Sequence, residues 1–234
     1  MKYFLLFILF TSSSLIYGQV DPTISVISRA RGAVLQATDA TGGPIPSAKE
    51  VVDGSSMLNE SFEKGVVKFK TGQQFKDVLL NLSLVNQQLY LKKDSTEMTF
   101  ILPVDYFVLP VTDEGKVQTF LFRSGYPAIG KQTSKSFYQI VADGAKFELL
   151  KFRNKTINER YVYGSPFKKE YKLEHRLFIY NVINKHISEI TTKVKSLKKA
   201  LPGYEADFDN YLSQKILPFK KEEEIKSLVD RINN

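Results

Sequence analysis

The sequence contains no cysteine and only two histidines among its 234 residues. The absence of cysteine excludes disulfides, thiolate zinc sites, iron–sulfur ligation and cysteine nucleophiles. It also excludes lipid attachment to a mature N-terminal cysteine. The stability of the fold must therefore come from the hydrophobic fraction of 43%, which is rich in phenylalanine (17) and tyrosine (12).

Signatures of catalysis are missing as well. The sequence has no G-x-S-x-G nucleophile elbow, no phosphate-binding loop and no dinucleotide fingerprint. His175 and His186 would form a metal site only if the fold brought them together with carboxylates such as Glu174 or Glu189. Their spacing is not that of a paired metal-ligand motif. We therefore expect no catalytic residue, no metal and no cofactor.

Paired carboxylates leave one enzymatic alternative, because glycoside hydrolysis needs neither cysteine nor histidine. Asp105, Asp113 and Glu114 lie near the ends of expected strands, where such groups would sit. Turn formation and solvation explain the same residues. An exported carboxylate-dependent hydrolase that acts on polysaccharide is the alternative function.

The first eighteen residues have the pattern of a secretory signal peptide. Lys2 precedes the unbroken apolar run Tyr3–Phe10, and the small residue Gly18 ends the segment. The run is far shorter than the ~20 residues that span a bilayer. We expect cleavage before Gln19, and an exported protein, periplasmic or secreted, that does not span the membrane after removal of the signal peptide.

The formal net charge is +8 and the isoelectric point is about 9.4. Such a surplus favours nucleic acid or anionic membrane surfaces as partners, and it is also typical of a well-solvated surface. No compact basic run is present, and an exported location argues against nucleic acid. We expect a solvated basic surface.

Residues 19–54 differ from the rest of the sequence in composition and lack its regular alternation of apolar and polar residues. The stretch 41–47 combines glycines and prolines, which indicates a loop. We expect a weakly structured lead-in over 19–54.

An antiparallel β body is expected over 55–193. Apolar and polar residues alternate with a period of two in several short runs, and turn-like residues such as Gly72 and Asp94 separate the runs. The best hairpin is expected over 137–150, with Gly144 in a tight turn that requires a positive φ. A loop is expected over 161–171, and a last hairpin joins 177–180 to 187–192.

The period changes in the C-terminal segment 194–234. Apolar residues recur there at offsets of three and four, which predicts two or three short helices that dock on the β body. The expected fold class is α+β, mostly β: an antiparallel β-meander or roll followed by short C-terminal helices.

Several stretches carry a resemblance to a known family. They are GSSMLNESFEKGVVKFKTGQQFKDVLLNLSLVNQQLYL, FYQIVADGAKFELLKF and the pair KSLKKALP and KKEEEIKSLVDRIN. Over most of 53–234 the chain resembles a family of uncharacterised exported proteins common in the Bacteroidota. The resemblance implies export and a β-rich body with a helical tail. It implies no catalytic or binding residue.

One cluster mixes aromatic and basic residues within the expected loop. Its members, accompanied by Arg160, are Tyr161, Tyr163, Phe167, Lys168, Lys169 and Tyr171. Aromatic and cationic side chains together favour nucleic acid or an anionic polymer, and an exported location argues against nucleic acid. We expect an exported, soluble cell-envelope protein that works as a non-enzymatic interaction or binding module. Its partner would be an envelope protein or an anionic polymer, and the sequence does not define its oligomeric state.

Overall fold

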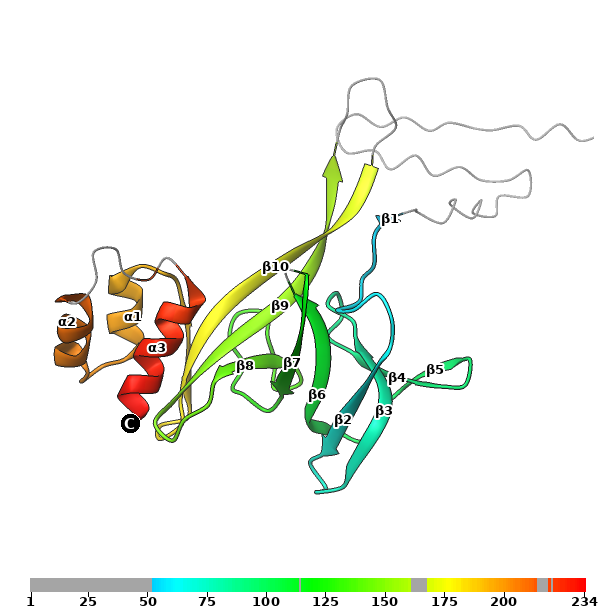
Figure 1. Cartoon of the computed structure of the whole chain (residues 1–234), viewed down its shortest axis with the longest axis horizontal. Helices are drawn as coiled ribbons and strands as arrows, with labels where there is room; N and C mark the ends of the chain where they lie inside the picture. Colours follow the sequence, from blue (N-terminus) through cyan, green and yellow to red (C-terminus); the bar gives the residue numbers. More distant parts are fainter. Residues whose placement is uncertain (1–51, 114, 161–167, 214–218, 220) are drawn as a thin grey trace, which may run out of the picture. The chain divides into compact units, whose positions relative to one another are not determined.

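The computed structural model describes residues 52–113, 115–160, 168–213, 219 and 221–234. The described part is mostly β, with eleven strands followed by three short helices (Figure 1). The predicted fold class is confirmed. The strands are β1 (Val52–Asp53), β2 (Glu63–Phe69), β3 (Gln74–Leu82), β4 (Leu89–Lys93), β5 (Thr96–Thr99), β6 (Val104–Asp113), β7 (Lys116–Arg123), β8 (Tyr138–Ala142), β9 (Phe147–Arg160), β10 (Lys168–Asn181) and β11 (His186–Ile190).

The strands form one mixed sheet in the order β1-β10-β9-β8-β7-β6-β2-β3-β4-β5. β11 also pairs with β10, on the edge opposite β9, at residues 177–181. Sequence neighbours pair as antiparallel hairpins around turns at Gly72, Asp94 and Gly115, all of which have positive φ. Within 55–193 every described strand pair is antiparallel, as predicted, and the one parallel pair among the described strands involves β1, from the segment 19–54. β1 runs parallel to β10, with Val52 opposite Lys169.

The hairpin predicted over 137–150 is present as β8–β9, but its turn differs from the prediction. Four residues, 143–146, separate the strands, and Gly144 is not among the glycines with positive φ. The absence of a side chain matters here for another reason. A Cβ at Gly144 would collide with the side chain of Asn233, which comes from the far end of the chain.

The prediction of a loop over 161–171 is also wrong in part. β9 and β10 are each 14 residues long and pair along their whole length, from Phe147 opposite Asn181 to Arg160 opposite Lys168. In Figure 1 the two strands run past the end of β8 as a two-stranded ribbon. We call residues 152–160 and 168–176 the β9–β10 ribbon.

The sheet contributes to three apolar clusters. One gathers side chains of β2, β3, β4, β6 and β7, including Val67, Leu80 and Phe107. The other two lie on the opposite faces of β8, β9 and β10, because side chains alternate along a strand. Leu149 belongs to the cluster that includes the helices, and its neighbour Leu150 belongs to the cluster around Tyr126.

The helices are α1 (Val194–Ala200), α2 (Glu205–Ser213) and α3 (Glu222–Asn233). α3 buries one stripe at helical spacing, formed by Ile225, Leu228, Val229 and Ile232. Its first turn carries three glutamates, which interact favourably with the positive end of the helix dipole. No helix in the described part of the chain is long and apolar enough to cross a membrane.

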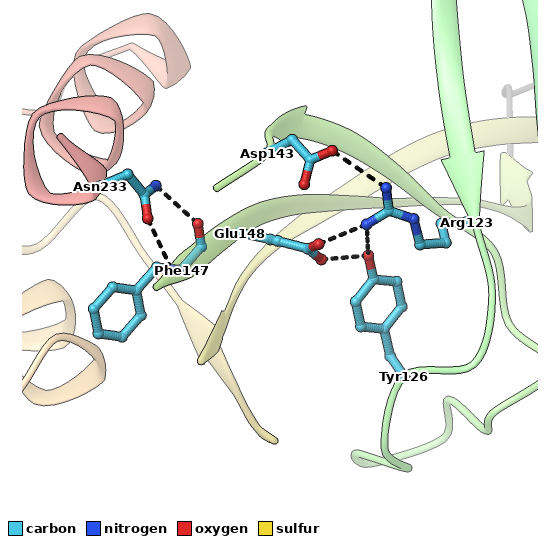
Figure 2. Close-up of polar contacts among 6 residues, drawn as sticks. All are labelled: Arg123, Tyr126, Asp143, Phe147, Glu148 and Asn233. Atoms are coloured by element: carbon cyan, nitrogen blue, oxygen red, sulfur yellow. Dashed lines mark hydrogen bonds and ion pairs between the residues drawn. The ribbon is translucent and has the colours of Figure 1, made fainter. Parts of the chain in front are cut away.

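Polar contacts join α3 to the β8–β9 hairpin (Figure 2). The Asn233 side chain accepts a hydrogen bond from the Phe147 amide (3.0 Å) and donates one to the Phe147 carbonyl (2.9 Å), as a neighbouring strand would. Lys146 donates to the carbonyl oxygen of Ile232 (2.8 Å), and Lys151 forms an ion pair with Glu222 (2.7 Å). Side-chain hydrogen bonds and an ion pair thus hold α3 against the β8–β9 hairpin.

Candidate binding site

A hollow of about 520 Å³ lies where the β9–β10 ribbon leaves the sheet. We call it the ribbon-base hollow. Three segments line it: the β3–β4 turn, the β7–β8 loop and the ribbon. The lining residues are Val85, Asn86, Gln87, Gln88, Lys131, Gln132, Thr133, Lys135, Ser136, Phe152, Asn154, Lys155, Thr156 and Arg176.

The β3–β4 turn is held by a hydrogen bond within the turn and by hydrogen bonds to the ribbon. Asn86 accepts a hydrogen bond from the Gln88 amide (3.0 Å), and the Gln87 side-chain nitrogen donates to the Arg153 carbonyl (2.9 Å). Gln87 itself has a φ of 57°, which is typical of a tight turn. The Lys155 amide donates to the Leu84 carbonyl (3.0 Å). The amide side chains of this turn therefore have fixed positions beside the ribbon.

The β7–β8 loop, residues 124–137, is ordered by its own hydrogen bonds. Ile129 and Gln132 exchange two backbone hydrogen bonds of 3.1 and 3.0 Å, and Gly125 donates to the Ser134 carbonyl (2.9 Å). The Ser136 hydroxyl accepts from the Thr133 amide (3.1 Å). This hydrogen bonding presents the segment KQTSKS, residues 131–136, to the hollow.

The ribbon supplies the third wall. Phe152, Asn154 and Thr156 alternate along β9, so they share a face. Arg176 lies opposite Phe152 in the register, and its guanidinium stands 5.6 Å from the centre of the Phe152 ring. The arginine also forms a 3.5 Å ion pair with Glu189, so its head group is held at the edge of the hollow.

The charged side chains in the described lining of the hollow are all positive. Its described lining includes the cations Lys131, Lys135, Lys155 and Arg176, and contains no Asp or Glu. The Lys155 ammonium donates to the carbonyls of Ser55 (2.8 Å) and Met57 (2.6 Å), and burial lowers its pKa. Lys131 and Lys135 are exposed and form no ion pair within the described ranges. Two cations are therefore available to an anion.

Two buried oxygens in the same lining have no hydrogen-bond partner among the described residues: Oε1 of Gln87 and Oε1 of Gln132. Gln132 is only 5% exposed. Buried side-chain oxygens usually accept at least one hydrogen bond. Both oxygens are covered by surrounding protein atoms, so a ligand in the hollow does not reach them without a change of side-chain conformation.

Neighbouring hollows extend the site in two directions. A hollow of about 560 Å³ shares Gln87, Gln88 and Lys135 with it and adds the apolar stretch 100–103 and Lys70. A smaller one, of about 330 Å³, shares Val85 and Asn86 and reaches Tyr171. The surface can therefore accommodate more than one unit of a linear molecule.

Three described members of the aromatic and basic cluster predicted from the sequence lie further along the ribbon. Lys168, Lys169 and Tyr171 are in strand β10, and Lys169 forms a 2.9 Å ion pair with Glu159. Tyr171 alone among them lines a hollow adjoining the ribbon-base hollow. Tyr161, Tyr163 and Phe167 lie outside the described residues.

The carboxylates considered for hydrolysis are dispersed or engaged. Asp113 forms a 2.5 Å ion pair with Arg153, and this hydrogen bond lowers the pKa of the aspartate against the opposing effect of burial. A general acid requires the opposite shift. Asp105 lies in β6 and its backbone carbonyl accepts from the Ser124 amide (2.9 Å), and Glu114 lies outside the described residues.

The structure does not bring the two histidines together. His175 lies in the ribbon, whereas His186 pairs with Asn181 at the other end of β10. The rise of a strand places these positions about 20 Å apart. No cluster of three or more metal-binding side chains is present among the described residues.

A buried carboxylate does occur at Glu148, in the cluster drawn in Figure 2. Burial raises its pKa, although hydrogen bonds from Tyr126 (2.5 Å) and Arg123 (2.5 Å) counteract part of the effect. Arg123 also forms a 3.2 Å ion pair with Asp143. A raised carboxylate pKa is a feature of many general acids. Here both oxygens are engaged and the side chain is only 8% exposed, so the cluster joins β7 to β9 and does not face a substrate.

Sequence reasoning missed the residues of the ribbon-base hollow. The signal was available in two short runs, NQQ at 86–88 and KQTSKS at 131–136, which concentrate amides, hydroxyls and lysines between expected strands. Their meeting depends on the ribbon, which the sequence did not predict. Comparisons with family models, curated proteins and solved structures gave no match for this chain. The family resemblance therefore stays a prediction.

Proposed function

We propose that the chain is an exported, non-enzymatic binding module of the cell envelope, and that it binds an anionic polymer in the ribbon-base hollow. One observation carries the proposal: the described lining combines four cations with amide and hydroxyl side chains and contains no carboxylate. Such a site attracts anions and can orient them through hydrogen bonds.

A polymer fits this surface better than a small anion. The ribbon-base hollow shares lining residues with two further hollows, of which the larger adds Lys70 and the smaller adds Glu97. Several weak contacts along one chain add up through effective concentration, so a repeating ligand gains affinity from each adjoining hollow.

The proposal of export rests on the sequence over residues 1–18. Export limits the possible binding partners, because an exported protein meets anionic polymers and envelope proteins and does not normally meet nucleic acid. The basic surplus of the chain supports an anionic partner in either case.

The hydrolase alternative receives less support. Its candidate Asp113 is held ionised by Arg153, and Glu148 has both oxygens occupied. A binding experiment with a polysaccharide also tests this alternative, because cleavage would release new reducing ends.

The test is binding of polygalacturonate, measured by titration calorimetry at two salt concentrations. We compare the parent with Lys131→Gln/Lys135→Gln. Losing two exposed ion-pair contacts should lower the affinity about twofold to thirtyfold. A matched control, Lys195→Gln/Lys199→Gln, makes the same charge change on α1 and should bind as the parent does. Salt should weaken binding by the parent more than binding by the hollow variant.

Equal affinities for the two double variants would overturn the assignment of the hollow. Failure of the parent to bind any polyanion would overturn the proposed function. New reducing ends during the titration would favour the hydrolase.

A further inference from the structure

Large apolar side chains are exposed at one end of the sheet, where the β2–β3 turn meets the segment 100–103 that joins β5 to β6. Ile101 is 100% exposed, Phe75 is 51% exposed and Leu102 is 44% exposed. Single apolar residues are common on protein surfaces, whereas a group of them marks a binding surface. We call these three residues the apolar tip.

Contacts within the sheet bring the members of the apolar tip together. The Lys70 amide in the β2–β3 turn donates to the Pro103 carbonyl (3.0 Å), so the turn and the segment 100–103 lie side by side. The Phe69 ring makes edge-to-face contacts with Phe75 (5.9 Å between centroids) and with Phe100 (5.4 Å). β2 ends and β6 begins at this same end of the sheet (Figure 1).

The backbone around the tip holds its side chains outward. Phe100 packs against the apolar cluster of β2, β3, β4, β6 and β7, and Val104 is buried in the same cluster. The segment is therefore anchored at both ends. Pro103 has a fixed φ, and it also restricts the backbone of Leu102 before it. Ile101 and Leu102 consequently have little freedom to turn toward the core.

Unpaired cations lie beside the apolar tip. Lys70 and Lys135 line the same 560 Å³ hollow as Ile101 and Leu102, and its described lining contains no Asp or Glu. Both lysines are exposed, and neither forms an ion pair within the described ranges. The ammonium of Lys70 lies close to Gly125 of the β7–β8 loop, so it is positioned at the edge of the hollow.

We propose that the apolar tip inserts into the head-group region of a membrane that contains anionic phospholipid, with Lys70 and Lys135 against the lipid phosphates. Exposed apolar side chains next to cations are the combination that attaches proteins to such surfaces. A folded partner protein fits less well, because a stable interface buries about 800 Å² on each partner in a complementary shape. Narrow turn segments enter a lipid surface without that requirement.

Insertion is tested directly by fluorescence, because the sequence contains no tryptophan and a single one reports its own surroundings. The variant Ile101→Trp is made in the chain 19–234, the form expected after export, since the apolar run of the leader would itself bind lipid. With vesicles of equal parts phosphatidylglycerol and phosphatidylcholine, its emission should shift to the blue and be quenched by brominated acyl chains. Val117→Trp, at a 72% exposed position at the opposite end of β6, is the control and should not respond.

Affinity is measured by co-sedimentation with the same vesicles. Ile101→Ser/Leu102→Ser should lower it about tenfold or more, because less apolar surface leaves water. Lys70→Gln should lower it about fivefold. The matched control Val117→Ser/Ile183→Ser removes two exposed apolar side chains elsewhere and should bind as the parent does. Vesicles of phosphatidylcholine alone should bind the parent more weakly, and salt should weaken binding to the anionic vesicles.

Three results would overturn the inference. The first is failure of the parent to bind the anionic vesicles, and the second is equal affinity of the two serine double variants. The third is a lipid-free parent that sediments as a dimer while Ile101→Ser/Leu102→Ser sediments as a monomer, because a second copy of the chain would then cover the tip. None of these results bears on the binding of polygalacturonate, so this inference and the proposed function fail separately.

Discussion

At the scale of single residues, the charged groups in the interior are paired. Arg153 is 6% exposed, and it donates to Gln139 (2.8 Å) and Asp113 (2.5 Å). Glu148 is paired with Arg123 and Tyr126. A buried charge left without its partner destabilises a fold strongly, so these contacts explain why the polar residues are tolerated inside the sheet.

The pH dependence of stability should reveal Glu148. Its pKa is raised above the ordinary value of 4.5, so the folded protein binds this proton more tightly than the unfolded chain does. The resulting stabilisation is fully present below pH 4.5 and is lost as the pH rises through the raised pKa. In urea titrations, the stability of the parent relative to Glu148→Gln should therefore fall as the pH rises above 4.5. Asp113 has the opposite sign and is common to both proteins. Parallel pH profiles would contradict the assignment.

Gly144 should contribute to stability because of its contact with Asn233. Gly144→Ala places a methyl group against the Asn233 side chain, which must then give up its bonds to the Phe147 backbone. We expect a loss of about 1–3 kcal/mol of unfolding free energy in denaturant titrations. In the background Asn233→Ala the same substitution should have an effect of less than about 0.5 kcal/mol. Additive effects in this double-mutant cycle would show that the two residues do not interact.

At the scale of elements, the hairpins were predictable wherever apolar and polar residues alternate between turn residues. The pairs β2–β3, β4–β5 and β6–β7 follow this rule, and so do the turns at Gly72 and Asp94. The ribbon was not predictable in this way. Its first strand reads FRNKTINER over 152–160, which has no apolar face. The two strands of the ribbon pair mainly with each other through backbone hydrogen bonds.

The candidate site could not be derived from the sequence for the same reason. Gln87, Gln132 and Asn154 come from three separate segments and meet only because the ribbon leaves the sheet beside a turn and a loop. The contact between Gly144 and Asn233 is equally non-local. The aromatic cluster attracted attention in the sequence because its residue types are distinctive, whereas amides and lysines in loops are common.

α3 should contribute strongly to stability through its buried stripe. Leu228 is fully buried in the cluster formed with β8 and β9. Leu228→Ala should lower the unfolding free energy by about 2–5 kcal/mol, because it leaves a cavity. Ile183→Ala, at a position that is 76% exposed, is the control and should change it by less than about 0.5 kcal/mol. Rapid amide exchange throughout 222–233 would contradict the packing of the helix.

At the scale of the whole molecule, the sequence over 1–18 predicts that the mature protein begins at Gln19. The apolar run is short, and Gly18 is the small residue at its exit. Intact-mass analysis of the protein recovered from cells should therefore give a chain without the first eighteen residues. Recovery of a chain that begins at Met1 from the envelope fraction would show that the leader is not cleaved.

The order of strands in the sheet has a consequence for how the chain folds. Most pairings join sequence neighbours, but β2–β6 and, above all, β1–β10 join distant segments. Closing a long loop is slow because its entropy must be lost before the contacts form. The hairpins should therefore form first and the β1–β10 pair last. Pulse-labelled amide exchange during refolding should protect β9 and β10 against each other before it protects Val52 and Asp53. The parallel edge, made by only two residues, would then mark the end of folding.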